Sequence, residues 1–368
     1  MNSELVYQIA LTLIMDIGPV SGKQFINYFG SAEAIFKARK ATLGKMPNIG
    51  ESRLNVLFSN RNEALHRAEQ ELLFLEKEKV EAIWYQDVRY PNRLLQCVDA
   101  PLLLYHKGNA NYNQPKTIGI VGTRRMTDYG KLMCEKLVAE LAPYQPLIIS
   151  GLAFGIDIVA HREALKNGLS TVAVVANGMD RMYPKEHLKT VKDMIKQGSV
   201  LTEYCSGSIP DKENFPQRNR IVAGMCDAMI VVETAIKGGA MITANLAIGY
   251  NRDVFAFPGD VNRPFSQGCN ELIKSTKAQL IESGKDVLQF MNWDDKPKKK
   301  NSVQKQLFVV LTPEEEQVVS LLQQYQSLEI DELCLKVSLS HSAVAGALLS
   351  LELQGLVQVL PGKRYKLC

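Results

Sequence analysis

Several short segments of the chain place glycine beside a positively charged or hydroxyl-bearing residue, where a turn follows an apolar run. The most informative is Ser150–His161, in which Gly151 and Gly155 separate a run typical of a buried strand from one typical of a helix. A glycine turn lets backbone N–H groups approach an anion, and the start of the following helix adds partial positive charge. This segment therefore predicts a site for a phosphate-like group.

Other segments of the same region add glycine turns or positive charge. They are Ile120–Arg125, Asn177–Lys185, Asn214–Arg220 and Thr234–Thr243. Taken singly each is ambiguous, because glycine often ends a strand and paired arginines often lie in solvent. Brought to one edge of one sheet, arginines and backbone amides are the usual means of holding successive phosphates. The set therefore favours anion binding over a purely structural role.

Catalytic chemistry is the weaker interpretation of this region. Asp157 and His161 lie four residues apart, so they share a helix face and could act as a pair. No nucleophile or metal-ligand set accompanies them. We expect Asp157 to cap the glycine turn and His161 to bond nearby backbone, both as structural support. Three other carboxylates are candidate bases: Asp180, Glu203 and Glu233.

Glu233 directly follows an apolar run, at a position where it could instead orient Arg124 or Arg218 through an ion pair. A dinucleotide cofactor is also disfavoured. Gly122 is followed by Thr-Arg-Arg instead of the further glycines of a Gly-x-Gly-x-x-Gly turn, and no Walker A lysine motif is present. The sequence therefore predicts no catalytic residue, no metal site and no cofactor.

Charge and cysteine content limit the class of protein. The 368 residues carry a net charge of +4. Lys and Arg outnumber Asp and Glu by 22 to 18 over residues 100–291, whereas they number 4 against 7 over 307–368. The central segment is thus the better partner for a polyanion. Seven dispersed cysteines predict reduced thiols, and no run approaches a membrane span. We expect a soluble cytoplasmic protein with no membrane partner.

The chain divides into segments of different pattern. Residues 1–75 predict a helical domain whose glycine breaks resemble helix-hairpin-helix (SAM-like) units. Residues 80–106 predict a short β segment that leads into an α/β region. The expected strands are Thr117–Val121, Leu147–Ile149, Thr171–Val175, Val200–Thr202, Ala228–Val232 and Val254–Ala256. The expected helices include Tyr129–Leu141, Pro184–Lys196, Ile221–Cys226 and Met241–Tyr250. Residues 80–291 therefore predict a Rossmann-like, doubly wound, mostly parallel sheet, which makes the chain a multidomain α/β protein.

The remaining residues predict a linker and a small third domain. Residues 292–306 form the polar linker, and 307–368 have the pattern of a winged helix, with a hairpin around Pro361-Gly362. The presumed recognition helix, Ser340–Leu353, contains no Lys or Arg. We therefore expect this domain to contact protein and to bind duplex DNA weakly.

The motifs of the central region, taken in order, resemble the bacterial DNA-processing protein A (DprA, also called Smf) family. They are Val121-Gly-Thr-Arg124, Ser150-Gly-Leu-Ala-x-Gly-Ile-Asp157, Tyr183-Pro184, Phe215-Pro-x-Arg-Asn-Arg220, Ile242-Thr-Ala244 and Phe257-Pro-Gly259. The resemblance implies a single-stranded DNA binder that protects incoming DNA and loads the RecA recombinase in natural transformation, usually as a homodimer. It also implies that Arg124 and Lys185 neutralise phosphates.

Three positions depart from the family pattern. Gly238 and Ala240 stand where serines are common, and His187 stands where an Asn is common. These changes remove side-chain donors but leave the backbone amides.

These arguments combine into one predicted DNA site that is independent of base sequence. Its residues are Gly122, Thr123, Arg124, Ser150, Gly151, Lys185, Leu188, Phe215, Arg218, Arg220, Gly238 and Gly239. The alternative is a nucleotide-processing hydrolase of the lysine-decarboxylase-like or phosphoribohydrolase type. Those proteins carry a Gly-Gly-x-Gly-Thr turn followed by a glutamate, whereas here Gly239 is followed by Ala-Met and no Glu lies in the next helix turn.

Overall fold

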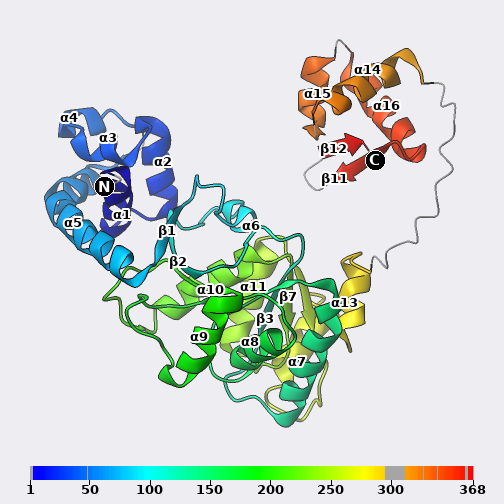
Figure 1. Ribbon diagram of the computed structural model, residues 1–368, viewed down its shortest axis with the longest axis horizontal. Helices are drawn as coiled ribbons and strands as arrows, with labels where there is room; N and C mark the ends of the chain where they lie inside the picture. Colours follow the sequence, from blue (N-terminus) through cyan, green and yellow to red (C-terminus); the bar gives the residue numbers. More distant parts are fainter. Residues whose placement is uncertain are drawn as a thin grey trace. The chain divides into compact units, whose positions relative to one another are not determined.

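The computed structural model describes residues 3–47, 49–294, 311–325, 327–337, 339–360 and 364–367 (Figure 1). The chain forms two compact units, Met1–Asp294 and Asp295–Cys368. Most of the predicted linker, residues 295–306, lies outside the described residues.

The first unit begins with a helical region that precedes the sheet. Its helices are α1 (Ser3–Leu13), α2 (Pro19–Phe29), α3 (Ala32–Lys37), α4 (Lys40–Leu43) and α5 (Glu51–Glu78). Pro19 opens α2 at a position where its missing N–H costs no hydrogen bond, and Gly30, at φ 86°, ends that helix. Apolar faces of these helices meet in a buried core that includes Ile9, Phe25 and Leu57.

A buried carboxylate joins α5 to the loop that follows strand β6 (Ser199–Thr202). The side chain of Glu71 is 1% exposed and accepts hydrogen bonds from the N–H of Ser206 at 2.9 and 3.1 Å. The Ser206 hydroxyl also donates to Glu71, and Arg67 donates to Glu71 at 2.9 Å. The helical region is therefore anchored to the α/β region by polar contacts as well as by its core.

The sheet has nine strands in the order β1-β2-β6-β5-β4-β3-β7-β8-β9. Besides β6, its strands are β1 (Glu81–Trp84), β2 (Leu103–Gly108), β3 (Thr117–Val121), β4 (Leu147–Ser150), β5 (Thr171–Val174), β7 (Ala228–Val231), β8 (Asp253–Ala256) and β9 (Gln279–Leu280). Strands β1 and β2 pair antiparallel at one side, and the pairs from β6 to β9 are parallel. This confirms the mostly parallel, doubly wound sheet predicted from the sequence.

The strand order reverses at β3. Crossovers from β3 lead first to β4, β5 and β6 on one side, and the chain then returns to β7 and β8 on the other. The carboxyl ends of β3 and its two neighbours therefore meet where the connections diverge, which is the usual ligand position in such a sheet.

Helices cover both faces of the sheet. One face carries α7 (Asp128–Leu141), α8 (Ile156–Lys166), α9 (Leu188–Gln197) and α13 (Gly284–Phe290). The other carries α6 (Asn92–Leu95), α10 (Asn214–Met225), α11 (Gly239–Gly249) and α12 (Gln267–Lys274). Alternate residues of the buried strands point to opposite faces of the sheet. Ile118 and Ile120 pack with α7 and α8, and Val121 packs on the opposite face. Two short 3-10 turns, η1 (Ala142–Tyr144) and η2 (Lys185–His187), precede β4 and α9.

Two helices begin more than three residues from the expected position. Helix α10 begins at Asn214 and not at Ile221, so the segment expected to precede the helix forms its first turns. Pro216 is compatible with this start, because the first turn of a helix has no intrahelical acceptor for its N–H groups. Helix α9 begins at Leu188, since Lys185–His187 form the η2 turn.

The second unit is a winged-helix fold, as predicted. It contains α14 (Pro313–Gln324), α15 (Ile330–Lys336), α16 (His341–Leu353), β10 (Leu328–Glu329), β11 (Val357–Leu360) and β12 (Arg364–Leu367). The strands form an antiparallel sheet in the order β10-β12-β11. Thr312 and Glu315 make a reciprocal capping box at the start of α14, with N···O distances of 2.8 and 3.3 Å. The expected turn around Pro361-Gly362 lies outside the described residues.

Within the described ranges, no single helix is long and apolar enough to cross a membrane. The bent pair α15 and α16 meets that criterion by length and composition alone, and the buried faces of both helices line the winged-helix core.

Candidate nucleic-acid interface

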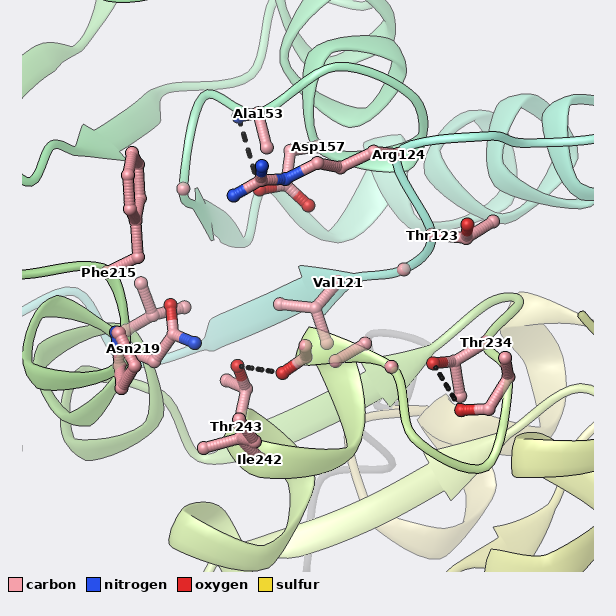
Figure 2. Close-up of a pocket in the computed structure, with 18 of the residues that line it drawn as sticks. Val121, Thr123, Arg124, Ala153, Asp157, Phe215, Asn219, Thr234, Ile242 and Thr243 are labelled. Atoms are coloured by element: carbon pink, nitrogen blue, oxygen red, sulfur yellow. Dashed lines mark hydrogen bonds between the residues drawn. The ribbon is translucent and has the colours of Figure 1, made fainter. Parts of the chain in front are cut away.

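A cavity of about 320 Å³ lies at the carboxyl ends of β3, β4 and β7, where the strand order reverses. Figure 2 shows its walls. Thr123 and Arg124 follow β3, and Ala153 and Asp157 follow β4. Phe215 and Asn219 lie on α10, Thr234 follows β7, and Ile242 and Thr243 lie on α11. A smaller hollow shares Arg124, Gly151 and Phe215 with this cavity and extends to Tyr183 and Pro184. We call the two together the switch-point pocket.

Most of the predicted site residues line this pocket. They are Gly122, Thr123, Arg124, Gly151, Phe215, Arg218, Gly238 and Gly239. Four others lie elsewhere: Ser150, Lys185, Leu188 and Arg220. The sheet therefore does bring three of the predicted turns to one place, as parallel strands require.

The turn after β3 holds Arg124 at the mouth of the pocket. The N–H of Thr123 donates to the carbonyl of Glu233 at 2.7 Å, and the carbonyl of Thr123 accepts from the N–H of Ile156 at 3.3 Å. Beyond these anchors the Arg124 side chain is exposed and extends toward the Phe215 side of the pocket (Figure 2). Among the described residues it has no carboxylate within ion-pair distance, so its charge is available to an anion.

The turn after β4 depends on two glycines. Gly155 has φ 80°, and a Cβ there would collide with the carbonyl of Thr123. Gly151 lies against the guanidinium of Arg218, which occupies the space that a Cβ would need. Only glycine lets the β3 and β4 turns and α10 approach one another this closely.

Arg218 lies beneath the pocket wall. Its side chain is 4% exposed, and Nη1 donates to the carbonyls of Gly151 and Val174. Burial lowers the pKa of its guanidinium to about 10, so the side chain stays charged at neutral pH. Arg218 thus adds positive potential to the pocket, and its Nη1 hydrogen bonds hold the backbone at Gly151 and Val174.

Arg220 faces a different part of the molecule. It pairs with Glu203 and donates to the carbonyl of Asp99, and its side chain is 13% exposed. The expectation that Arg218 and Arg220 converge on one site assumed a turn in this segment. Because the segment is helical, residues two apart point about 200° from each other.

Ser150 is also inside the protein. It is fully buried, and its hydroxyl donates to the carbonyl of Ile120, which ties β4 to β3. The end of β4, from which this part of the pocket wall continues, is therefore fixed by a side chain that contacts no solvent.

Asp157 and His161 are held by protein contacts. Asp157 is 6% exposed and accepts from the N–H of Ala153 at 3.3 Å (Figure 2). Burial raises the pKa of its carboxyl group, and the nearby charge of Arg218 opposes that rise. His161 lies with Nδ1 at 2.7 Å from Oγ1 of Thr171, a side-chain partner instead of the expected backbone. Burial lowers the pKa of the His161 imidazole to about 3, so the ring is neutral.

Glu233 does not form the ion pair with arginine that the sequence allowed. Its carboxylate is buried and accepts from the N–H of Thr127 at 2.9 Å and from the Thr127 hydroxyl at 2.8 Å. Thr127 is the residue that caps α7. Glu233 therefore fixes the start of a helix, and the described residues contain no group of His, Cys, Asp or Glu able to hold a metal ion.

Aromatic side chains form the rim of the pocket. The rings of Tyr183 and Phe215 lie 6.1 Å apart, and the ring of Phe154 lies 4.8 Å from that of His187. Tyr183 and Phe154 are 44% and 42% exposed. Such rings offer faces on which bases stack.

Lys185 and Leu188 are exposed just beyond Tyr183-Pro184, next to the rim but outside the lining. His187, the departure from the family pattern, is buried and donates from Nδ1 to the carbonyl of Leu152 at 2.9 Å.

The predicted site omits several residues that line the pocket. Four of them lie within segments that the sequence had singled out, and Phe265 does not: Phe154, Tyr183, Asn219, Ile242 and Phe265. Asn219 could have been found, because it lies four residues after Phe215 and shares its helix face once α10 is started at Asn214. Phe265 belongs to a loop far along the chain that no local pattern connects to the pocket.

Known protein families match both the α/β region and the winged-helix unit. The family model of DNA recombination-mediator protein A matches residues 81–292, and that of the DprA winged helix domain matches residues 307–363. Protein Smf of Synechocystis is 30% identical over 99% of each chain. DNA processing protein DprA of Streptococcus pneumoniae is 39% identical over 67% of this chain and 86% of its own.

Two solved structures are similar. The X-ray structure of DprA from Streptococcus pneumoniae has 31% sequence identity and a TM-score of 0.65, and the match covers 78% of this chain and 98% of that one. DprA from Helicobacter pylori, whose structure was described for its single-stranded DNA binding mode, has 30% identity and a TM-score of 0.54, over 59% of this chain and 97% of that one.

Proposed function

The chain belongs to the DNA recombination-mediator protein A (DprA/Smf) family, and on that premise we propose that it binds single-stranded DNA in the switch-point pocket, without base-sequence preference, in natural transformation. The observation that carries this proposal is the exposed Arg124 beside the Phe215 ring at the mouth of the pocket. A positive charge that can bind a phosphate and an aromatic face that can stack with a base lie side by side there.

In this proposal the strand is held by two kinds of contact. Arg124 and Lys185 neutralise phosphates, and the backbone amides of Gly122, Thr123 and Gly151, with Gly239 at the start of α11, add donors. Bases stack on Phe215 at the rim, with Leu188 as an apolar neighbour beyond it. Arg218 lines the pocket as a buried charge held by backbone carbonyls, whereas Arg220 pairs with Glu203 outside the lining.

A binding role also fits the polar groups of the pocket better than hydrolysis does. Asp157, His161 and Glu233 each have partners within the protein, in an arrangement that leaves no base beside a nucleophile. No Glu follows the Gly239-Ala240 turn, where the hydrolase alternative requires one. We therefore infer that the protein is not an enzyme and needs no cofactor.

Further roles rest on family membership. We infer that the bound strand is protected and passed to the RecA recombinase in the cytoplasm, and that the protein acts as a homodimer. For the winged-helix unit we propose protein contact. Helix α16 has no Lys or Arg, and Leu349 and Leu353 are 59% and 82% exposed on it.

The test compares binding of single-stranded and duplex oligonucleotides of equal length by fluorescence anisotropy over a salt series. We expect the single strand to bind more tightly and log K to fall linearly with log salt, with a slope of about −0.7 for each neutralised phosphate. Arg124→Glu should abolish binding at moderate salt. Arg125→Glu makes the same charge change at an exposed neighbour outside the pocket lining and serves as the control. Equal affinity for both forms of DNA, or unchanged binding by Arg124→Glu, would refute the proposal.

A further inference from the structure

A groove runs between α8 and α9 on the surface of the first unit. One hollow of about 420 Å³ is lined by Arg162, Leu165, Glu186, Lys189, Thr190 and Asp193. The next is lined by Leu165, Lys166, Asp193, Lys196 and Gln197. Because Leu165 and Asp193 belong to both, the two hollows form one continuous feature, which we call the α8–α9 groove.

The groove begins where the switch-point pocket ends. The pocket reaches Tyr183 and Pro184, and the lining of the groove starts at Glu186. The residue between them is Lys185, which is exposed. A polymer that leaves the pocket past Tyr183 therefore meets a charged side chain and then the open end of the groove.

Positive side chains line both walls of the groove. Lys189 and Lys196 come from α9, and Arg162 and Lys166 come from α8. Lys166 and Lys196 are 72% and 78% exposed. Arg162 is steadied at the base of the groove, since its Nε donates to Oγ1 of Thr190 at 3.4 Å.

The carboxylates of the groove cancel this charge only in part. Glu186 and Asp193 line it, and Glu163 pairs with Lys166 at 3.1 Å, so four cations face three anions and the net charge stays positive. Asp193 lies 3.9 Å from Nζ of Lys196, a loose surface pair that contributes little and that a phosphate can replace.

The size of the groove suits a short stretch of nucleic acid. Lys189 and Lys196 are seven residues apart on one helix, which corresponds to about 10 Å at 1.5 Å per residue. Phosphates of one strand rise about 3.4 Å along the axis of duplex DNA and lie farther apart in an extended single strand, so this length accommodates at most about three of them. The hollow is also open and shallow, as a site for a continuing polymer requires.

From the continuity, charge and length together, we infer that the α8–α9 groove binds the part of the same DNA strand that extends beyond the switch-point pocket. This inference rests on the proposed function, because it assigns a second segment of the strand to a second surface. It predicts that affinity increases with strand length until the groove is filled.

The experiment uses the full chain with all three groove lysines neutralised, as Lys166→Gln, Lys189→Gln and Lys196→Gln together. The control carries Lys131→Gln, Lys136→Gln and Lys285→Gln, which remove the same charge from exposed positions on α7 and α13 in the same helix layer. Each protein is titrated with a strand of about 6 nucleotides and one of about 20, since single-stranded DNA sites span about 4–16 nucleotides.

We expect the groove variant to bind the long strand about 10- to 100-fold more weakly at 0.1 M salt, and its salt slope to fall by about 2, while the short strand binds within about twofold of the unaltered protein. The control should match the unaltered protein with both strands. Equal losses for both lengths, or no loss for the long strand, would overturn the groove assignment. Loss of all binding by Arg124→Glu would still support the pocket, so the two proposals can fail separately.

Discussion

The guanidinium carbon of Arg124 lies 5.2 Å from the centroid of the Phe215 ring, and this contact joins the turn after β3 to the first turn of α10. Both residues line both parts of the switch-point pocket. The contact positions a cation and an aromatic face before any strand arrives, so little side-chain freedom remains to be lost on binding.

Phe215→Ala should weaken single-strand binding by about 1–3 kcal/mol, or about 5- to 150-fold, because one stacking face is lost. A double-mutant cycle with Arg124→Ala, measured on the unfolding free energy by chemical denaturation, should give a coupling energy of about 0.5–1 kcal/mol for the cation–π pair. Phe215→Tyr keeps the ring and should bind nearly as the unaltered protein does. Strictly additive losses would contradict the coupling.

Arg218→Ala should lower the free energy of unfolding by about 3 kcal/mol, because the carbonyls of Gly151 and Val174 lose a charged donor in a buried place. Arg220→Ala should cost about as much, since it leaves Glu203 with no partner. Chemical denaturation provides the measurement, with Arg125→Ala as an exposed control expected within about 0.5 kcal/mol. We also expect Arg220→Ala to keep its DNA affinity under folding conditions. A large loss of affinity with unchanged stability would show that Arg220 contacts the strand.

Gly155→Ala should reduce both stability and DNA affinity. Gly155 has φ 80° and lies against the carbonyl of Thr123, so an added Cβ strains the backbone and displaces the turn that carries Arg124. Gly168 provides the matched control, because it has φ 72° but open space where a Cβ would lie. Gly168→Ala should cost about 1 kcal/mol of stability and leave affinity unchanged. If anisotropy gave the same DNA affinity for Gly155→Ala and Gly168→Ala, the turn after β4 would not be part of the binding site.

Acid should destabilise the protein through His161. Burial lowers the pKa of the folded imidazole to about 3 from 6.5, so between these values the unfolded chain binds a proton that the folded chain does not. Stability should therefore fall as pH decreases from 6.5 toward 3, by up to about 1.4 kcal/mol per pH unit for this group.

The slope of unfolding free energy against pH, from urea denaturation, is the readout. This slope should be shallower in His161→Gln than in the unaltered protein. An unchanged slope in His161→Gln would contradict the assignment. Part of the slope should persist, because burial also lowers the pKa of His106 and His187.

The sequence predicted the elements that depend on local pattern. Apolar runs such as Thr117–Val121 and Ala228–Val232 became parallel strands, and the glycine turns after β3, β4 and β7 did meet at one pocket. The expectation that Arg218 and Arg220 converge came from starting α10 seven residues late. In the helix that the structure shows, their side chains point in opposite directions. A local shift in helix start thus changes which side chains share a site.

Contacts between distant parts of the chain gave no local signal. Glu71 and Ser206 are 135 residues apart, and Glu233 binds Thr127, the N-cap of α7, from 106 residues away. Long-range partners of this kind are fixed by topology, and a single sequence without related ones does not reveal them.

The Glu71–Ser206 contact connects the first helices to the pocket. Ser206 belongs to the loop that runs from β6 into α10, and α10 carries Phe215 in its first turn. A buried carboxylate therefore links α5 to the segment that presents the aromatic ring. A partner that binds the helical region is therefore connected to the switch-point pocket through this contact, even though it touches none of the pocket's residues.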